Sequence, residues 1–177
     1  MCNICVYLVN PMRTTKTGRF VGDWLSLPFS DEERDEVFCQ LGSPNEYKDF
    51  FITHAETENL DIDIDYTTDL TELNELAKKI DALSCEDDYK LAAYLEWVPH
   101  LTLAEISAVI DRLDNYDFLS DVYDGKDFEQ YCIREFGSMD ALPGKISKYS
   151  DLFKHDNGIS YCLDMYYSSL GVIIRTS

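Results

Sequence analysis

The sequence predicts an α+β protein, arranged as an elongated row of three small domains. Short β-branched and aromatic segments near both ends are typical of small antiparallel sheets, and the stretch between them has helical periodicity. Each apolar stripe on the predicted helices is narrow, which suits serial small cores better than one large core. We therefore expect a mixed α/β domain over residues 1–62, a helical middle domain over 63–102 and a mixed α/β domain over 103–177.

Strands are expected to open the first domain. Cys5–Val9 and Arg19–Leu25 are rich in apolar, β-branched and aromatic residues, and together they predict a hairpin. The polar segment Pro11–Gly18 is predicted to be the loop between them. Tyr47–Ala55 has a similar composition and predicts a third strand.

A capping box predicts the helix of the first domain. Ser30 is followed three residues later by Glu33, so each side chain can bond the backbone N–H of the other residue. The helix is expected over residues 31–41 and should end at Gly42, because glycine readily adopts the left-handed conformation of a helix end. Its buried residues are expected to be Val37, Phe38 and Leu41.

Three consecutive helices are predicted between residues 69 and 114. The first starts after Asp69 and the third after Thr102, since each of these residues has a glutamate three positions later. The second starts after Ser84 and ends before Pro99, because the residue ahead of a proline avoids the helical region. Apolar residues recur at helical spacing in the first and third of these helices: Leu70, Leu73, Leu76, Ala77, Ile80 and Leu83, and Leu103, Ile106, Val109, Ile110 and Leu113.

The last domain is predicted to mix strands and helices. The expected elements are a strand over Phe118–Tyr123, a turn at Asp124 and Gly125, a helix over Asp127–Phe136 that stops at Gly137, a short helix over Ile146–Phe153, and a closing hairpin of Tyr161–Tyr167 with Gly171–Arg175.

The composition is that of a folded but strongly acidic chain. Hydrophobic residues make up 45% of the 177 residues and aromatic residues 13%, which is enough for folded cores. There are 34 Asp and Glu against 15 Lys and Arg, so the formal net charge is −19. Binding to phosphates needs a basic stripe, so this charge argues against direct binding to nucleic acid or to an anionic membrane surface.

The acidic residues are concentrated in the middle of the chain. Residues 1–22 hold Arg13, Lys16 and Arg19 and no acidic residue, whereas residues 23–140 hold 31 acidic and 8 basic residues. Such an excess of one sign is self-repelling and costs stability, and it is larger than solubility requires. The excess therefore indicates a function for the carboxylates themselves.

The sequence predicts a cytoplasmic protein. The N-terminal segment lacks the pattern of a signal peptide, and no apolar run is long enough to span a membrane. The six cysteines are scattered along the chain, which favours reduced thiols over a disulfide framework.

No motif predicts catalysis, and we expect no enzyme activity, no cofactor and no metal. The chain has no nucleophile elbow, phosphate-binding loop or metalloprotease motif, and its three histidines are far apart in sequence. Cys2 and Cys5 have the spacing of a zinc or redox pair. No second pair of ligands follows them, however, and the segment leads into a predicted strand.

The segment Asp61–Glu72 needs separate consideration because its acidic spacing fits a calcium-binding EF-hand loop. The position that needs glycine for the sharp turn is Tyr66, and the preceding segment shows no helical stripe. An acidic extended segment that leads into a capped helix is the favoured interpretation, and a calcium site remains an alternative.

Three stretches of the chain resemble the ArdA antirestriction proteins. Gly18-Arg-Phe-Val-Gly-Asp-Trp-Leu-Ser-Leu-Pro resembles the family's G-x-x-x-G-x-W-L-x-L opening. Asp69–Leu95, with Leu73-Asn-Glu-Leu-Ala and Leu91-Ala-Ala-Tyr-Leu-Glu, resembles the central helical stretch, and Asp117–Gly137 with Tyr149–Gly158 resembles the C-terminal third. The similarity covers nearly the whole chain and agrees in length and acidity.

The resemblance implies a non-catalytic DNA mimic that occupies the DNA-binding groove of a type I restriction–modification enzyme. It also implies a curved row of three domains and a homodimer formed through the C-terminal domain. The acids expected to take the places of phosphates are Asp61, Asp63, Asp65, Asp81, Glu86, Asp87, Asp88, Asp111, Asp114, Asp117, Asp121 and Asp124. The residues expected at the dimer interface are Phe128, Tyr131, Phe136 and Tyr166. A generic acidic module that binds another basic protein is the main alternative function.

Overall fold

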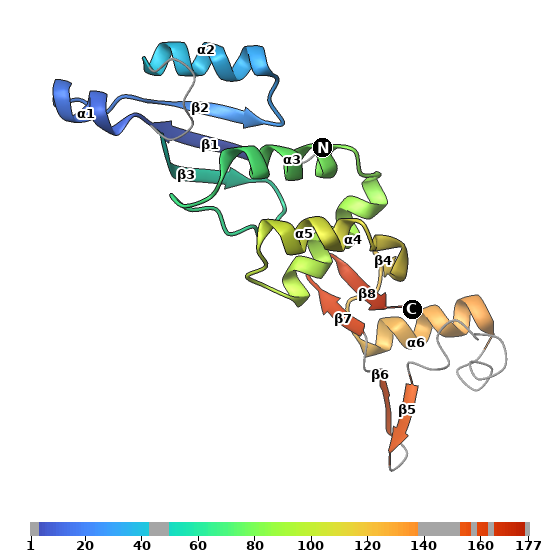
Figure 1. The fold of residues 1–177 in the computed structure, drawn as a ribbon. Helices are drawn as coiled ribbons and strands as arrows, with labels where there is room; N and C mark the ends of the chain where they lie inside the picture. Colours follow the sequence, from blue (N-terminus) through green and yellow to red (C-terminus); the bar gives the residue numbers. More distant parts are fainter. Residues whose placement is uncertain (1–3, 43–49, 138–152, 157–158, 163–164, 176–177) are drawn as a thin grey trace. The chain divides into compact units, whose positions relative to one another are not determined.

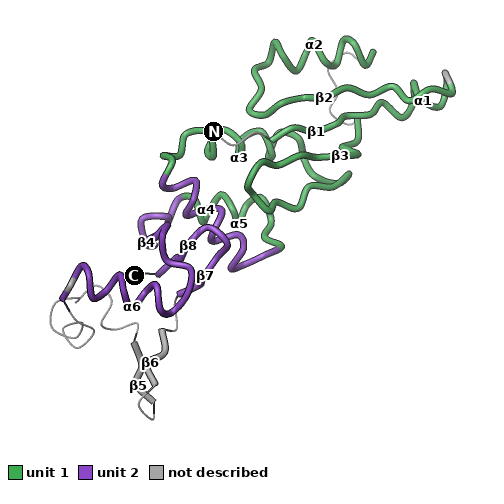
Figure 2. Tube along the Cα trace, turned by 180° about the vertical axis from the view of Figure 1, so that it is seen from behind, with its two compact units in different colours: residues 1–85, 100–110 green, residues 86–99, 111–177 purple. Residues whose placement is uncertain are grey.

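The computed structural model describes residues 4–42, 50–137, 153–156, 159–162 and 165–175, and its contacts divide the chain into two compact units (Figure 2). Unit 1 comprises residues 1–85 and 100–110, and unit 2 comprises residues 86–99 and 111–177. Short antiparallel sheets and six α-helices make up the described part, which confirms the α+β class. The row of three domains, with boundaries at residues 62 and 102, stays a prediction.

Unit 1 contains a three-stranded antiparallel sheet of order β2-β1-β3 (Figure 1). The central strand β1 (Ile4–Val9) pairs with β2 (Gly22–Leu27) on one side and with β3 (Phe51–Thr57) on the other. Both outer strands begin later than predicted. One face of the sheet is apolar and buried, and it is formed by Ile4, Val6, Leu8, Leu25, Leu27 and Ile52.

The predicted loop between the first two strands is instead a helix, α1 (Pro11–Thr17). The buried Asn10 caps it, with Oδ1 accepting a hydrogen bond from the Arg13 amide at 3.1 Å. Pro11 stands at the first helical position, where its fixed φ suits a helix. Gly18 ends the helix in the left-handed conformation, with a φ of 64°. The loop was predicted because the segment is polar. The sequence nevertheless contains the signals that start and stop a helix, namely Asn10, Pro11 and Gly18, and these decide the structure.

Helix α2 (Asp31–Leu41) packs against β2, and its predicted capping box is confirmed. Ser30 Oγ accepts from the Glu33 amide at 3.3 Å, and Glu33 Oε2 accepts from the Ser30 amide at 2.8 Å. Phe38 and Leu41 are buried as expected, whereas Val37 is half-buried. The helix ends at Gly42 in the left-handed conformation, as predicted.

Helices α3 (Leu70–Asp81) and α5 (Leu103–Ile110) complete unit 1 and pack against each other. Asp69 caps α3, and Thr102 and Glu105 form the predicted capping box at the start of α5. The predicted stripe of α3 is buried except for the half-buried Leu83: Leu70, Leu73, Leu76, Ala77 and Ile80.

Asn74 ties α3 to the segment that joins β2 and α2. The residue is 5% exposed. Its Oδ1 accepts from the Phe29 amide at 2.9 Å, and its Nδ2 donates to the Phe29 carbonyl at 3.3 Å. Both backbone groups of a buried residue are thereby satisfied inside the unit.

Unit 2 is built on a sheet of order β4-β8-β7, formed by β4 (Tyr116–Leu119), β8 (Gly171–Arg175) and β7 (Met165–Ser168). Helix α6 (Gly125–Phe136) covers one face, where a buried cluster is formed by Val122, Phe128, Cys132, Val172 and Ile174. A two-stranded ladder of β5 (Phe153–Asp156) and β6 (Ile159–Cys162) is separate from this sheet.

Helix α4 (Cys85–Trp97) covers the other face of this sheet with aromatic side chains. Ring centroids lie 6.2 Å apart for Tyr89 and Phe118, and 5.2 Å apart for Tyr94 and Tyr116. Strand residues alternate between faces, so these rings lie opposite the cluster under α6. The start after Ser84 and the end before Pro99 agree with the predicted helix.

Three predictions for this region need correction, and a fourth falls mostly on residues that the structure does not describe. The strand predicted over residues 118–123 spans Tyr116–Leu119. Asp124 and Gly125 form the start of α6 rather than a hairpin turn, because the Asp124 carboxylate caps the helix. Tyr161 belongs to β6, so the closing hairpin contains only β7 and β8. The predicted helix over residues 146–153 lies outside the described residues, except for Phe153 in β5.

The turn between β7 and β8 is held by Glu96 of α4. The Glu96 carboxylate accepts hydrogen bonds from the Ser169 amide and hydroxyl. Gly171 follows with a φ of 147°, and a Cβ there would lie 2.4 Å from the Leu119 carbonyl oxygen. The close approach of β4 therefore requires glycine at this position. None of the described helices is both long and apolar enough to cross a bilayer.

Replacing Asn74 by alanine should destabilise the protein by about 1–3 kcal/mol, because the buried amide and carbonyl of Phe29 would lose their partners. Urea unfolding measures the change. Gln40→Ala, at an exposed position of α2, is the control and should have little effect. Equal unfolding midpoints for the two variants would contradict the role of Asn74.

Candidate acidic surface

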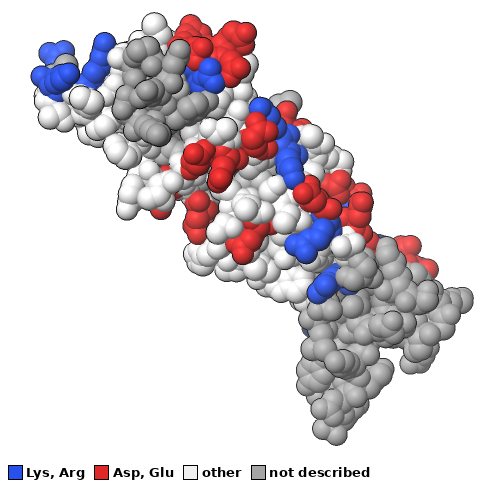
Figure 3. Space-filling model, viewed as in Figure 1, with Lys and Arg blue, Asp and Glu red and all other residues white. Residues whose placement is uncertain are grey.

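The acids predicted to take the places of phosphates divide between the two units. Unit 1 holds Asp61, Asp63, Asp65 and Asp81, all exposed. Unit 2 holds the exposed Glu86, Asp111, Asp114, Asp121 and Asp124 and the half-buried Asp87, Asp88 and Asp117. Both units are acidic, with 18 acidic and 7 basic residues in unit 1 and 16 and 8 in unit 2. On the face drawn in Figure 3, acidic side chains alternate with Lys and Arg.

Several exposed carboxylates are held by backbone amides. Asp65 Oδ1 accepts from the Thr67 amide at 2.7 Å and from the Thr67 hydroxyl at 2.6 Å. Asp124 Oδ1 accepts from the amides of Lys126 and Asp127 at 2.7 and 3.0 Å. Such bonds restrict the rotamers of a short side chain, so each carboxylate has a defined position.

The same hydrogen bonds favour the ionised forms. Donation from the Thr67 hydroxyl, then from its amide, lowers the pKa of Asp65, and the Asp127 and Lys126 amides lower the pKa of Asp124. The capping boxes act in the same direction, because bonds from the Ser30 and Thr102 amides lower the pKa values of Glu33 and Glu105. These groups therefore keep their negative charge at acidic pH better than an ordinary carboxyl does.

Lys90 organises the acidic start of α4. The residue is 9% exposed, and its Nζ lies 3.3 Å from Glu86 Oε1 and 3.2 Å from Asp87 Oδ1. Burial acts to lower the pKa of Lys90, but the hydrogen bonds to Asp87 and Glu86 outweigh it and the pKa is raised. One buried cation thus fixes two acids at a helix N-terminus, where negative charge is stabilised. This role of Lys90 was not predicted from the sequence, although acids three and four positions before a lysine in a helix indicate such ion pairs.

Asp63 differs from the other acids of unit 1 because it contacts a histidine. His100 Nδ1 lies 2.8 Å from Asp63 Oδ2, and this hydrogen bond raises the pKa of His100. Both side chains are mostly exposed, so the pair adds little stability. The hydrogen bond and the charge of Asp63 both raise the pKa of His100 and so favour its protonated form.

The acidic segment that leads into α3 does not gather its carboxylates around a point. Asp65 is bonded to Thr67, Asp69 caps the helix and Asp63 meets His100. Among the described residues, no group of three or more His, Cys, Asp and Glu side chains is arranged to hold a metal ion. The structure therefore gives no support to the calcium alternative. Cys2 of the Cys2–Cys5 pair lies outside the described residues.

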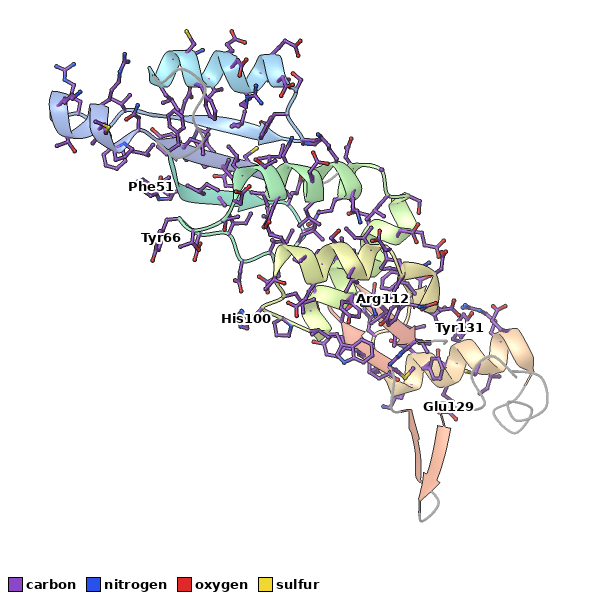
Figure 4. The ribbon with its side chains drawn as sticks, viewed as in Figure 1. Phe51, Tyr66, His100, Arg112, Glu129 and Tyr131 are labelled. Carbon is purple, nitrogen blue, oxygen red and sulfur yellow. The ribbon has the colours of Figure 1, made fainter. Side chains whose placement is uncertain are left out.

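The residues predicted at a dimer interface are largely engaged within unit 2. Phe128 is 5% exposed and belongs to the core. Tyr131 stacks on Phe128 at 6.4 Å, and Tyr166 stacks on Trp97 at 6.2 Å. Figure 4 shows Tyr131 on the side of α6 opposite Glu129. The side chain of Phe136 lies outside the described part.

Exposed carboxylates on two small folded units define a strongly acidic α+β protein. Comparison with protein families gives a closer assignment. The family model described as "Antirestriction protein (ArdA)" matches residues 13–166 of the chain. The chain belongs to the ArdA family, which implies an antirestriction function and an interaction with type I restriction enzymes. No curated protein sequence matches the chain.

Replacing Asp124 by alanine should lower the free energy of unfolding at neutral pH, because α6 loses its cap. The pKa of Asp124 is lowered by folding, so its stabilisation is present above the unfolded pKa and is lost as pH falls through the folded pKa. The difference from the unsubstituted protein should therefore shrink as the pH falls below 3.8, the ordinary pKa of an aspartate side chain. Urea unfolding over a pH series measures this difference, with the exposed Asp121→Ala as control. A difference that stays constant with pH would contradict the capping role.

Proposed function

We propose that the chain is a non-catalytic DNA mimic that occupies the DNA-binding groove of a type I restriction–modification enzyme in the cytoplasm. The observation that carries the proposal is the set of exposed carboxylates held in defined positions on both acidic units. A groove that binds DNA is lined by cations, and the carboxylates offer those cations the charge that phosphates would supply.

The amount of charge suits this role. Two copies together carry twice the net charge of −19, that is −38. Duplex DNA carries one charge per about 1.7 Å of axis, so this charge corresponds to about 65 Å of duplex, or roughly 19 base pairs. A homodimer would thus carry the charge of a DNA segment of roughly 19 base pairs.

The anchoring of the carboxylates also favours tight binding. A flexible acidic tail loses conformational freedom when it is ordered on a partner. Carboxylates on capped helices have lost most of that freedom on folding. The ion pairs of Lys90 with Glu86 and Asp87 act in the same way, because they fix two charges before the partner arrives.

The proposed homodimer forms through the C-terminal part of the chain. In this proposal Tyr131, Tyr166 and Phe136 contribute to the interface, while Phe128 supports it from the core. The large apolar side chains of Ile133 and Tyr167, 47% and 37% exposed, add contact area. We further propose that three small domains form an elongated row, so that the acidic surfaces extend as DNA does.

Neutralising exposed acids should weaken inhibition of DNA cleavage by a type I enzyme. Asp61→Asn, Asp81→Asn, Asp114→Asn and Asp121→Asn combined should raise the half-inhibitory concentration on the order of tenfold, because four attractive charge pairs are lost. The unsubstituted protein should inhibit stoichiometrically and lose potency as salt rises, since salt screens exposed charges.

The matched control replaces four neutral exposed residues, Gln40→Ala, Ser26→Ala, Thr53→Ala and Gln130→Ala, and should inhibit as the unsubstituted chain does. Inhibition that is equally potent at low and high salt would contradict the proposal. So would inhibition that the four combined Asp→Asn substitutions leave unchanged.

Small-angle scattering tests the proposed assembly. A compact dimer of twice 177 residues would have a radius of gyration of about 20 Å. We expect a dimer with a clearly larger value, because separate acidic domains repel one another along the row. A monomer, or a dimer near the compact value, would contradict the extended assembly.

A further inference from the structure

Four large apolar side chains are exposed near one end of the unit 1 sheet. Met12, Phe20, Trp24 and Phe51 are 58%, 72%, 43% and 44% exposed. Val9 at the end of β1 pairs with Gly22 on one side and with Phe51 on the other, which places these segments next to one another. A concentration of exposed apolar side chains in one region is a mark of an interaction site.

Aromatic rings also cross the open face of this sheet. Tyr7 is paired with Trp24 and with His54, and its ring centroid lies 5.2 Å and 6.4 Å from theirs. Tyr7 alternates with the buried Val6 and Leu8, so the three rings lie on the face opposite the core. A Cβ at Gly22 would lie 2.7 Å from Tyr7 Cε1, so only glycine leaves room for this ring.

The segment that carries two of these side chains, Met12 and Phe20, is basic, whereas unit 1 as a whole is acidic. Arg13, Lys16 and Arg19 lie in α1 and the segment after it, and residues 1–22 contain no acid. In Figure 3 the Lys and Arg side chains gather at the α1 end, and Figure 4 shows Phe51 on β3 in the same part of unit 1. We name this region, with Tyr7, Met12, Lys16, Phe20, Trp24 and Phe51, the aromatic–basic surface.

We propose that the aromatic–basic surface docks on a protein surface of the target enzyme outside its DNA-binding groove, an apolar patch bordered by carboxylates. This inference rests on the proposed function. The cations of a DNA-binding groove would repel Lys16 and its neighbours, so this surface cannot serve as part of the DNA mimic. Trp, Tyr, Arg and Met are the residues that protein interfaces favour, and apolar contacts supply affinity that salt does not screen.

A single-stranded nucleic acid would also use aromatic rings and cations, but the charges disfavour it. Binding of a polyanion requires a basic groove that follows the backbone. The sheet face carries Glu56 beside Cys5, and unit 1 as a whole holds 18 acidic against 7 basic residues. A protein partner with a few carboxylates can be bound by the few cations of residues 13–19 and does not need a continuous basic groove.

The test is binding of the full-length chain to the type I enzyme that it inhibits, measured at low and at high salt. Phe20→Ser with Phe51→Ser should weaken binding on the order of tenfold at both salt concentrations, because two exposed anchors are lost. Lys16→Glu should weaken binding mainly at low salt. The matched controls are Tyr123→Ser and Gln130→Ala, at exposed positions of unit 2, and they should bind as the unsubstituted chain does.

Circular dichroism and urea unfolding establish that each variant is folded. If the unsubstituted chain binds and inhibits but the Phe20 and Phe51 variant binds equally well, the docking inference is overturned and the proposed function stands. If the unsubstituted chain neither binds nor inhibits, the proposed function fails first. Binding of a labelled single-stranded oligonucleotide that the same variant abolishes would overturn the inference in favour of a nucleic-acid surface.

Discussion

Repulsion among carboxylates is the constraint to which this fold must adapt. The chain holds 34 acidic residues against 15 basic ones, and a small domain has only a few kcal/mol of net stability with which to oppose their repulsion. Each unit has its own buried core, built from Val6, Leu8 and Phe38 in unit 1 and from Phe128, Val172 and Ile174 in unit 2. These buried cores stabilise the fold, and most of the charged side chains lie on the surface.

The placement of the acids reduces the repulsion locally. Asp69 and Asp124 cap helices, and Glu33 and Glu105 complete capping boxes, so these charges lie at helix N-termini where the helix dipole is favourable. Glu86 and Asp87 share the ammonium group of Lys90. The bonds that relieve repulsion also fix the carboxylates, and a binding surface benefits from charges that need no further ordering.

Local signals in the sequence were the most reliable guides to this structure. The capping boxes at Ser30 and Thr102 and the apolar stripe of α3 involve residues within one or two helical turns, and all are confirmed. Helix α1 was missed because its polar composition concealed the cap at Asn10. Sheet pairings join residues far apart in sequence, so the separation of Tyr161 from the β7–β8 hairpin could not be read from composition.

Features of the surface were harder to predict than elements of the fold. The exposed setting of Asp61, Asp81 and Asp114 follows from the polar faces of the helices and loops. The roles of Asn74 and Lys90 depend on burial, which their residue types alone do not suggest. The aromatic–basic surface arises only when β1 pairs with strands on both sides.

Occupation of a DNA-binding groove by carboxylates can be measured most directly by competition. A labelled duplex bound to the type I enzyme is titrated with the protein at several concentrations of unlabelled duplex. If both ligands use one groove, the apparent dissociation constant of the protein rises in proportion to the duplex concentration, and no ternary complex forms. An apparent dissociation constant that is independent of duplex concentration, or an enzyme that holds duplex and protein together, would contradict DNA mimicry.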